Sequence, residues 1–291
     1  MFLTIFTPTY NRAHTLGRLY ESLTRQTDFD FEWIVVDDGS TDKTEALVAD
    51  FSHRDNKFSI TYCKQPNGGK HRAINRGVKL AKGDWFFIVD SDDYLTDDAV
   101  ETIKPYMNEV FRMPDFAGVV FNRIYHNRET IGTSCDYEIL DSDFLSYRVR
   151  LKYWGDKADI IKTSILQNYP FPDYPNEKFC TEGLVWYRMA KKYKARFINK
   201  GIYLCEYLPN GLTDTYNKIM EDSPKYSMIY YKELCLNPKL SIIQRFFAEA
   251  AYWKHYVKCE LIEIAPTRGM LLRKPLIELG TKLNKLRKKI L

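Results

Sequence analysis

The chain has 291 residues, of which 45% are hydrophobic and 28% charged, so it can bury a substantial core. Its formal net charge is +5, but residues 267–291 alone carry +7 and the other 266 residues sum to −2. A nucleic-acid-binding protein would spread positive charge over a folded face, so this distribution excludes that class. The six scattered cysteines form no Cys-x-x-Cys pair, which excludes a zinc ribbon or a disulfide scaffold and is typical of a reducing compartment.

The first ninety-five residues alternate strand-like and helix-like segments. Strands are predicted over residues 2–7, 31–36, 58–63 and 85–89, and helices over residues 13–26, 43–51 and 68–81. Ser40 or Thr41 is expected to cap the second helix, and Gly83 to end the third in a left-handed conformation. This βαβαβαβ order requires right-handed crossovers, so we predict an α/β fold with a mostly parallel sheet flanked by helices.

Beyond residue 98 the pattern is mixed. Strands are predicted over residues 116–125, 131–139, 155–161, 196–199 and 203–207, and a helix over residues 181–193. The stretch from 223 to 264 has a helical pattern that Pro238 breaks. We therefore expect these residues to extend the sheet and to end in a helical C-terminal region.

Three polar segments follow predicted parallel strands at their carboxyl ends. They are residues 7–12, 37–40 and 90–93. Each has a structural explanation of its own, as a Pro-Thr turn, a helix-capping Asp or a capped helix. Their coincidence at one edge of one sheet instead favours a binding site, because open α/β sheets bind ligands beyond the carboxyl ends of their strands.

The residue types in these segments match the parts of a nucleotide. Asp90, Ser91 and Asp92 carry oxygens that can share one hard divalent cation, which would compensate carboxylates so crowded. The aromatic ring and the acid of the other two segments, Tyr10 and Asp38, can stack on a base and accept from its imide N–H.

Basic side chains complete this pattern. Arg12 or Lys70 can neutralise phosphate. Together the three segments predict a nucleoside diphosphate that is held by one sheet edge and a metal.

These segments resemble the nucleotide-binding half of family 2 glycosyltransferases, which share the GT-A fold, over roughly residues 1–210. Residues 90–92 match the family's Asp-x-Asp signature, and residues 67–75 resemble its glycine-led helix beside the nucleotide. The resemblance implies that Asp92 and Asp90 serve Mn²⁺ or Mg²⁺, with Asp90 also near the ribose. It further implies a UDP-sugar donor. The donor-binding residues would be Pro8, Tyr10, Arg12, Asp38, Gly69, Lys70, Asp90 and Ser91.

The family also implies a general base on a later helix, usually within an acidic pair. Glu182 has this position, although Gly183 stands where a second acid is usual. The base would take the proton of an acceptor hydroxyl that attacks the anomeric carbon, and a single in-line displacement would invert its configuration. The structural alternative is a first-turn Glu that favours the helix dipole. Asp156 and Glu177 are the alternative bases.

The resemblance also divides the chain by function. Residues 1–95 would bind the nucleotide sugar, residues 96–210 the acceptor within the same GT-A domain, and residues 211–266 would form a helical region. The acceptor would be a glycan or a polyprenyl-diphosphate-linked glycan in bacterial capsule or O-antigen synthesis. The alternatives are a sugar nucleotidyltransferase, which usually has a glycine-rich basic loop after its first strand, and an inactive nucleotide-sugar-binding protein at the membrane.

The C-terminal segment, residues 267–291, has the pattern of a basic amphipathic helix. Its apolar residues recur at 276, 279, 283, 286 and 290, which is one stripe of a helix, and basic residues surround them. This pattern is typical of a helix on an anionic membrane surface. The alternative is a helix that is solvated or docked on the body.

The start of the chain and its hydropathy predict the location. The apolar residues 1–6 are interrupted by Thr7-Pro8 too early for a signal peptide, and no apolar run approaches the roughly 18 residues of a membrane span. We therefore expect a cytoplasmic protein that is peripheral on the inner face of the bacterial plasma membrane.

Overall fold

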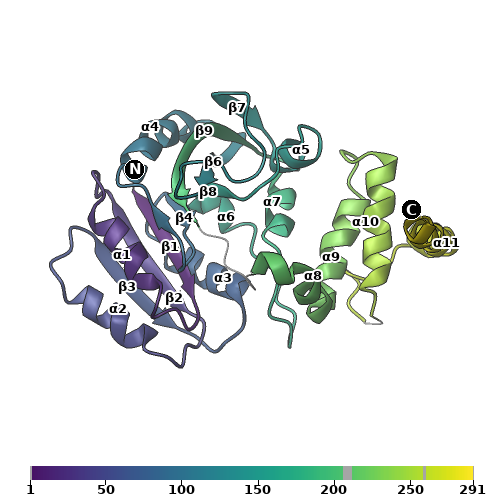
Figure 1. The fold of residues 1–291 in the computed structure, drawn as a ribbon, viewed down its shortest axis with the longest axis horizontal. Coiled ribbons are helices and arrows are strands. Elements are labelled where there is room, and N and C mark those ends of the chain that lie inside the picture. The colour runs from purple at the N-terminus through teal and green to yellow at the C-terminus, as the bar shows by residue number, and fades with distance from the viewer. Residues whose placement is uncertain (1, 206–211, 258–259, 291) are drawn as a thin grey trace. The chain divides into compact units, whose positions relative to one another are not determined.

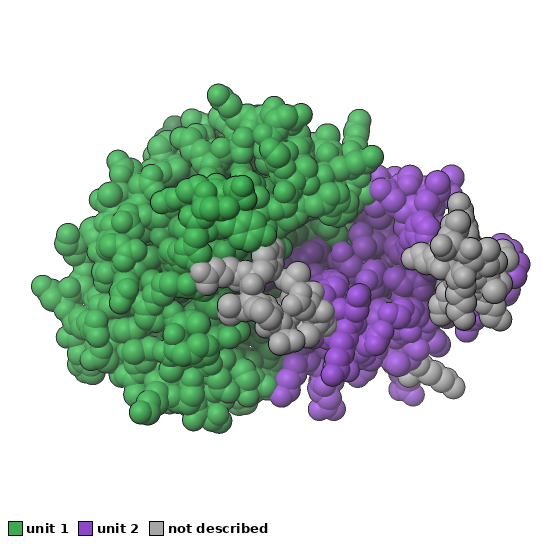
Figure 2. Space-filling model, in the orientation of Figure 1, with its two compact units in different colours: residues 1–172, 185–209 green, residues 173–184, 210–291 purple. Residues whose placement is uncertain are grey.

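The computed structural model describes residues 2–205, 212–257 and 260–290. It divides into two compact units, drawn green and purple in Figure 2. Unit 1 comprises Met1–Pro172 and Val185–Pro209, and unit 2 comprises Asp173–Leu184 and Asn210–Leu291. Helix α7 (Gly183–Met189) crosses this division.

A nine-stranded sheet organises the described part of unit 1 (Figure 1). Its strands are β1 (Leu3–Thr9), β2 (Phe31–Asp37), β3 (Ser59–Lys64), β4 (Trp85–Ile88), β5 (Tyr94–Leu95), β6 (Phe116–Ile124), β7 (Ile139–Ser142), β8 (Lys157–Lys162) and β9 (Lys194–Leu204). Their order is β3-β2-β1-β4-β8-β6-β9-β5, and β7 pairs with β9.

Most strands of this sheet run in the same direction. Strands β3, β2, β1 and β4 are parallel to one another, and so are β6 and β9. Strand β8 lies between β4 and β6 and is antiparallel to both. The predicted α/β fold with a mostly parallel sheet and flanking helices is confirmed, and β8 joins its two parallel parts.

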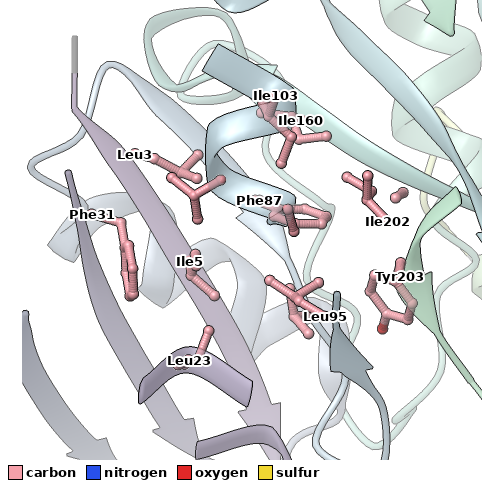
Figure 3. Packing of buried hydrophobic residues seen from close by; sticks show 14 of the residues in the cluster. Leu3, Ile5, Leu23, Phe31, Phe87, Leu95, Ile103, Ile160, Ile202 and Tyr203 are labelled. Carbon is pink, nitrogen blue, oxygen red and sulfur yellow. The ribbon is translucent and has the colours of Figure 1, made fainter. Parts of the chain in front are cut away.

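Helices cover both faces of the sheet. Those of unit 1 are α1 (Leu16–Thr24), α2 (Thr44–Ser52), α3 (Lys70–Leu80), α4 (Ala99–Phe111), α5 (Phe144–Val149) and α6 (Thr163–Leu166). On one face, buried residues such as Ile5 and Phe87 form a cluster with Leu23 of α1 and Ile103 of α4 (Figure 3). On the other face α3 packs against β1 and β2. The sheet is therefore buried on both faces here, which explains the apolar run of β4 and the burial of every residue of β1 and β2.

One local prediction in this half is wrong. Helix α3 ends at Leu80, Ala81 is extended with φ −59° and ψ 130°, and Gly83 has no positive φ. The glycine is needed for a close approach instead, because a Cβ there would lie 2.6 Å from the backbone nitrogen of Thr4.

Two element predictions also differ from the structure. The strand expected over residues 131–139 is wrong, since β7 begins only at Ile139. Gly132 has φ +88°, and a Cβ there would lie 2.1 Å from the carbonyl oxygen of Trp154, so the backbone is a tight loop. The helix expected over residues 181–193 is shorter and spans only α7.

Unit 2 is helical in its described part. Its helices are α8 (Leu212–Asp222), α9 (Pro224–Cys235), α10 (Ile242–Lys254) and α11 (Arg268–Ile290). The predicted break near Pro238 is confirmed, and α10 restarts with a capping box of Ser241 and Gln244. None of the described helices is both long enough and apolar enough to span a membrane.

Candidate functional site

Three loops meet at the carboxyl edge of β1, β2 and β4. In the parallel register Thr9 pairs with Asp37 and Phe6 with Ile88, so the residues after these strands leave the sheet side by side. The N–H of Asp38 donates to the carbonyl of Thr9 at 2.8 Å. The predicted gathering of the three polar segments at one edge is therefore confirmed.

Hydrogen bonds tie the loops after β1 and β2 together. The N–H of Asn11 donates to Ser40 Oγ at 2.8 Å, and Asn11 Oδ1 accepts from the N–H of Thr41 at 2.8 Å. Asn11 has φ 53°, a left-handed conformation that Asn adopts more readily than most residues. The prediction that Ser40 or Thr41 caps α2 is wrong. The N-cap residue is Lys43, and no side chain caps this helix.

Tyr10 stands on this tied loop with 48% of its surface exposed. An exposed ring on a braced backbone offers a flat face to a base at little ordering cost. Pro8, in contrast, is buried within β1, where its fixed φ holds the strand end.

Asp38 organises the loop that leads into α3. Its Oδ1 accepts from Gln65 Nε2 at 2.8 Å and from the N–H of Gly68 at 2.9 Å. Its Oδ2 accepts from the N–H of Gly69 at 2.7 Å and from Asn67 Nδ2 at 3.1 Å. A carboxylate offers about four acceptor positions, so a nucleotide base whose N–H donates to Asp38 must share the two oxygens with the backbone and side chains of this loop.

The same loop presents Gly69 and Lys70 at the start of α3. Gly69 has φ +100°, a conformation that L side chains rarely adopt, so a glycine is required there. Lys70 Nζ lies 2.5 Å from Asp90 Oδ1. The predicted basic group and the acidic loop after β4 are thus in direct contact.

Asp90 is held from two sides. Besides Lys70, Arg123 places its Nη1 3.2 Å from Asp90 Oδ2. Burial alone would raise the pKa of Asp90, but the charges of Lys70 and Arg123 outweigh it and hold that pKa below its usual range. Asp90 is therefore an ionised and fixed anchor of the loop.

Arg123 and Tyr203 are site residues that sequence reasoning missed. They pair with each other in the β6–β9 register, and the guanidinium lies 4.1 Å from the centre of the Tyr203 ring. The Tyr203 hydroxyl accepts from the N–H of Asp90 at 2.8 Å and donates to Asp93 Oδ2 at 2.8 Å. Burial, followed by the charges of Asp90 and Asp92, raises the pKa of Asp93 to about 7.

Asp92 is the acid of this loop that faces outward. Its side chain is 31% exposed and its Oδ2 lies 3.4 Å from Arg12 Nη2. Its carbonyl accepts from Arg18. Ser91 beside it is buried, at 5% exposure. Of the three predicted cation ligands, Asp92 is therefore the one placed to meet a ligand from outside.

The carboxylates at this edge of the sheet fit a cation that binds together with the phosphates of a ligand. No group of three or more His, Cys, Asp or Glu residues in the described part of the chain has the geometry of a metal site. Mg²⁺, however, is commonly held by one or two carboxylates together with substrate phosphates and water. Asp92 meets that description. Asp90 already pairs with Lys70 and Arg123, so its service as a second metal ligand stays a prediction.

The predicted bases lie on different parts of the chain. Glu182 is half-buried and directly precedes α7, as expected, and it belongs to unit 2. Glu177 is buried and accepts from the N–H groups of Lys225, at 2.9 Å, and of Tyr226, at 3.1 Å, so it holds the start of α9. Asp156 is exposed before β8 in unit 1. Glu182 and Asp156 remain the candidate bases.

The sequence matches a known family and several curated proteins. A model described as "Glycosyl transferase family 2" matches residues 4–189. The GalNAc(5)-diNAcBac-PP-undecaprenol beta-1,3-glucosyltransferase of Campylobacter jejuni is 30% identical over an alignment of 210 positions that covers 68% of this chain and 62% of that protein. Glycosyltransferase GlyG of Streptococcus pneumoniae is 32% identical over 142 residues, 49% of this chain and 45% of that protein. The chain thus spans less than two thirds of these relatives.

Solved structures share the fold at low sequence identity. The S. aureus TarS 1-349 structure in complex with UDP-GlcNAc aligns with a TM-score of 0.65 and 20% identity, covering 88% of this chain and 72% of that chain. The mannosyltransferase PcManGT from Pyrobaculum calidifontis, in complex with GDP-Man and Mn2+, aligns with a TM-score of 0.57 and 16% identity, covering 97% and 79%.

Proposed function

Since the chain belongs to glycosyltransferase family 2, we propose that this glycosyltransferase moves a sugar from a UDP-linked donor to a glycan hydroxyl, with inversion and with a divalent cation. The observation that carries the proposal is the sheet edge at which the loops of Tyr10, Asp38 and Asp92 leave side by side. The complex of S. aureus TarS with UDP-GlcNAc supports a uridine nucleotide as the donor.

The base and the diphosphate of the donor are held by different groups. Tyr10 stacks on the base, and Asp38 accepts from its imide N–H. The diphosphate contacts Arg12 and Lys70, both of which already lie against carboxylates of the acidic loop. When the donor enters, each basic group exchanges a carboxylate for a phosphate without a long movement.

Asp92 is the residue that would hold Mn²⁺ or Mg²⁺. Such a cation supplies positive charge to the diphosphate as it leaves, and the Mn2+ in the PcManGT structure supports this choice. With a cation on Asp92, Arg12 would no longer be needed as its partner and would be available to the phosphate. Arg123 and Tyr203 keep the loop in place during this exchange, because they hold Asp90 and Asp93 from inside.

Glu182 is the proposed base. It takes the proton of the acceptor hydroxyl as that oxygen attacks the anomeric carbon opposite the leaving diphosphate. We expect Glu182→Gln to keep donor affinity, measured by calorimetry, and to lower the transfer rate by about 10² to 10⁴-fold. Near-wild-type turnover in Glu182→Gln would move the base elsewhere, and a parallel Asp156→Asn variant would identify the alternative.

The proposed acceptor is a lipid-linked glycan. The Campylobacter relative is named for GalNAc(5)-diNAcBac-PP-undecaprenol, a glycan on a polyprenyl diphosphate. By analogy residues 96–210 bind the acceptor, and the enzyme acts in bacterial surface polysaccharide synthesis such as capsule or O-antigen. We place it at the inner face of the plasma membrane, attached through the basic C-terminal segment 267–291.

A panel of nucleotide sugars tests the activity class. With Mn²⁺ present, a transferase releases free sugar slowly from its own donor in the absence of acceptor, and it also gains thermal stability from that donor. Donor binding without turnover would instead support an inactive binding protein. Consumption of pyrophosphate to form a nucleoside triphosphate would support the nucleotidyltransferase.

A further inference from the structure

The C-terminal helix α11 is docked on α10 by one of its faces. Met270 and Ile277 on that face are buried, at 0% and 3% exposure. Arg273 Nη2 lies 2.9 Å from Oε2 of Glu249, a residue of α10 whose side chain is 5% exposed. The start of this helix is therefore part of folded unit 2 and is not a free tail.

Four leucines of the same helix are exposed on the side away from α10. Leu271, Leu272, Leu276 and Leu279 have 53%, 74%, 66% and 56% of their surface exposed. A helix turns by about 100° per residue, so these positions fall within an arc of about 140°. Met270 lies on the opposite side of the helix from this arc. A contiguous apolar face of this kind marks a contact surface.

The net charge of the segment that carries this face indicates what covers it. Residues 267–291 contain eight Lys or Arg residues and one acid. Two copies of the chain that packed their leucines together would bring two segments of the same net charge near each other, which is unfavourable. An anionic bilayer attracts the same charges and also accepts the leucine side chains.

We propose that the leucine face, defined as Leu271, Leu272, Leu276 and Leu279, inserts into the surface of an anionic lipid bilayer with α11 lying in the membrane plane. This rests on the membrane association proposed above and assigns it to one face of one helix. Because the opposite face is docked through Met270 and the ion pair between Arg273 and Glu249, the bilayer would fix the orientation of unit 2 and would not merely tether it.

Vesicle binding by the full chain tests this assignment. Co-sedimentation is measured with vesicles of phosphatidylcholine alone and of phosphatidylcholine mixed with phosphatidylglycerol. We expect the wild type to bind the anionic vesicles. The double variant Leu272→Gln/Leu276→Gln should bind them at least about tenfold more weakly. Unchanged binding by this variant would overturn the proposal.

A matched control separates this face from apolar exposure in general. Ile242 and Ile243 of α10 are 83% and 69% exposed, and Ile242→Gln/Ile243→Gln is expected to change vesicle binding by less than about twofold. An equal loss in both double variants would overturn the assignment to α11. A wild-type dimer in solution that only the leucine variant abolishes, with vesicle binding retained, would also overturn it and indicate a second copy.

Donor hydrolysis without vesicles keeps this test distinct from that of the enzyme activity. Both double variants should hydrolyse the donor at the wild-type rate, since neither pair belongs to the donor edge. They should also unfold at the wild-type midpoint, because all four side chains are exposed. Absence of hydrolysis in all three proteins would refute the proposed activity, whereas the vesicle result would still decide the role of the leucine face.

Discussion

The buried cluster of unit 1 and the leucine face of unit 2 place large apolar side chains in opposite environments. In unit 1 the cluster that includes Ile5, Phe87 and Ile103 is buried, and buried charges pair with each other, as Arg123 does with Asp90. Unit 2 leaves large apolar residues in the open, with Ile242 at 83% and Leu272 at 74% exposure. Internal contacts therefore explain the cluster of unit 1, whereas the leucine face of unit 2 is the surface that we propose to contact a bilayer.

The packing of unit 1 predicts the largest effect on stability. Gly77→Ala is expected to lower the free energy of unfolding by about 2 kcal/mol, because the added Cβ would lie 2.2 Å from the ring of Phe6. The matched control is Gly17→Ala in α1, where nothing lies within 4 Å of a Cβ. It should raise the free energy of unfolding by about 0.5 to 1 kcal/mol. Urea unfolding measures both, and equal effects would contradict the packing described for α3.

The charge network of unit 1 predicts a smaller loss of stability together with a loss of turnover. Tyr203→Phe removes the hydroxyl that contacts Asp90 and Asp93, and should lower the free energy of unfolding by about 1 kcal/mol. It should also lower kcat, because the acidic loop loses the hydrogen bonds that hold Asp90 and Asp93 in position. Thermal unfolding and donor hydrolysis measure the two effects.

A second tyrosine separates these two effects. The Tyr20 hydroxyl donates to Asn56 Oδ1 at 2.8 Å, away from the acidic loop. Tyr20→Phe should therefore lower stability by a similar amount and leave kcat unchanged. If both variants kept the wild-type kcat, Tyr203 would have only a structural role.

The open face of unit 2 predicts the smallest effect. Leu272→Gln should change the free energy of unfolding by less than about 0.5 kcal/mol, since its side chain contacts mainly solvent. Met270→Gln, on the buried face of the same helix, should cost more than about 1 kcal/mol. Similar costs for the two variants, measured by urea unfolding, would mean that α11 has no distinct docked face.

The sequence was sufficient wherever a local pattern determined the structure. Residues 85–89 are a continuous apolar run followed directly by the polar residues 90–93, so this strand and its end at the sheet edge could be predicted together. The helix break at Pro238 has a similarly local cause. The stripe that includes Leu276 and Leu279 was also visible in the sequence, and the structure adds that both are exposed.

The failures come from contacts that are distant along the chain. Gly83 resembled the glycine that ends a helix, but a glycine is needed there because the backbone of Thr4 lies too close for a Cβ. The contact of Glu177, an alternative base, with the start of α9 also could not be read from the sequence. Arg123 and Tyr203 pair in a β6–β9 register that contains irregularities, so their pairing cannot be predicted from their spacing in the sequence.

The most direct test concerns Asp92 as the meeting point of donor and cation. UDP is titrated by calorimetry into the wild type and Asp92→Asn, with Mn²⁺ and then with EDTA. We expect Mn²⁺ to strengthen UDP binding in the wild type by about tenfold or more, and this gain to vanish in Asp92→Asn but persist in Asp97→Asn, a control whose acid forms an exposed ion pair with Arg25. An unchanged Mn²⁺-dependent gain in Asp92→Asn would contradict the assignment of the cation to this edge.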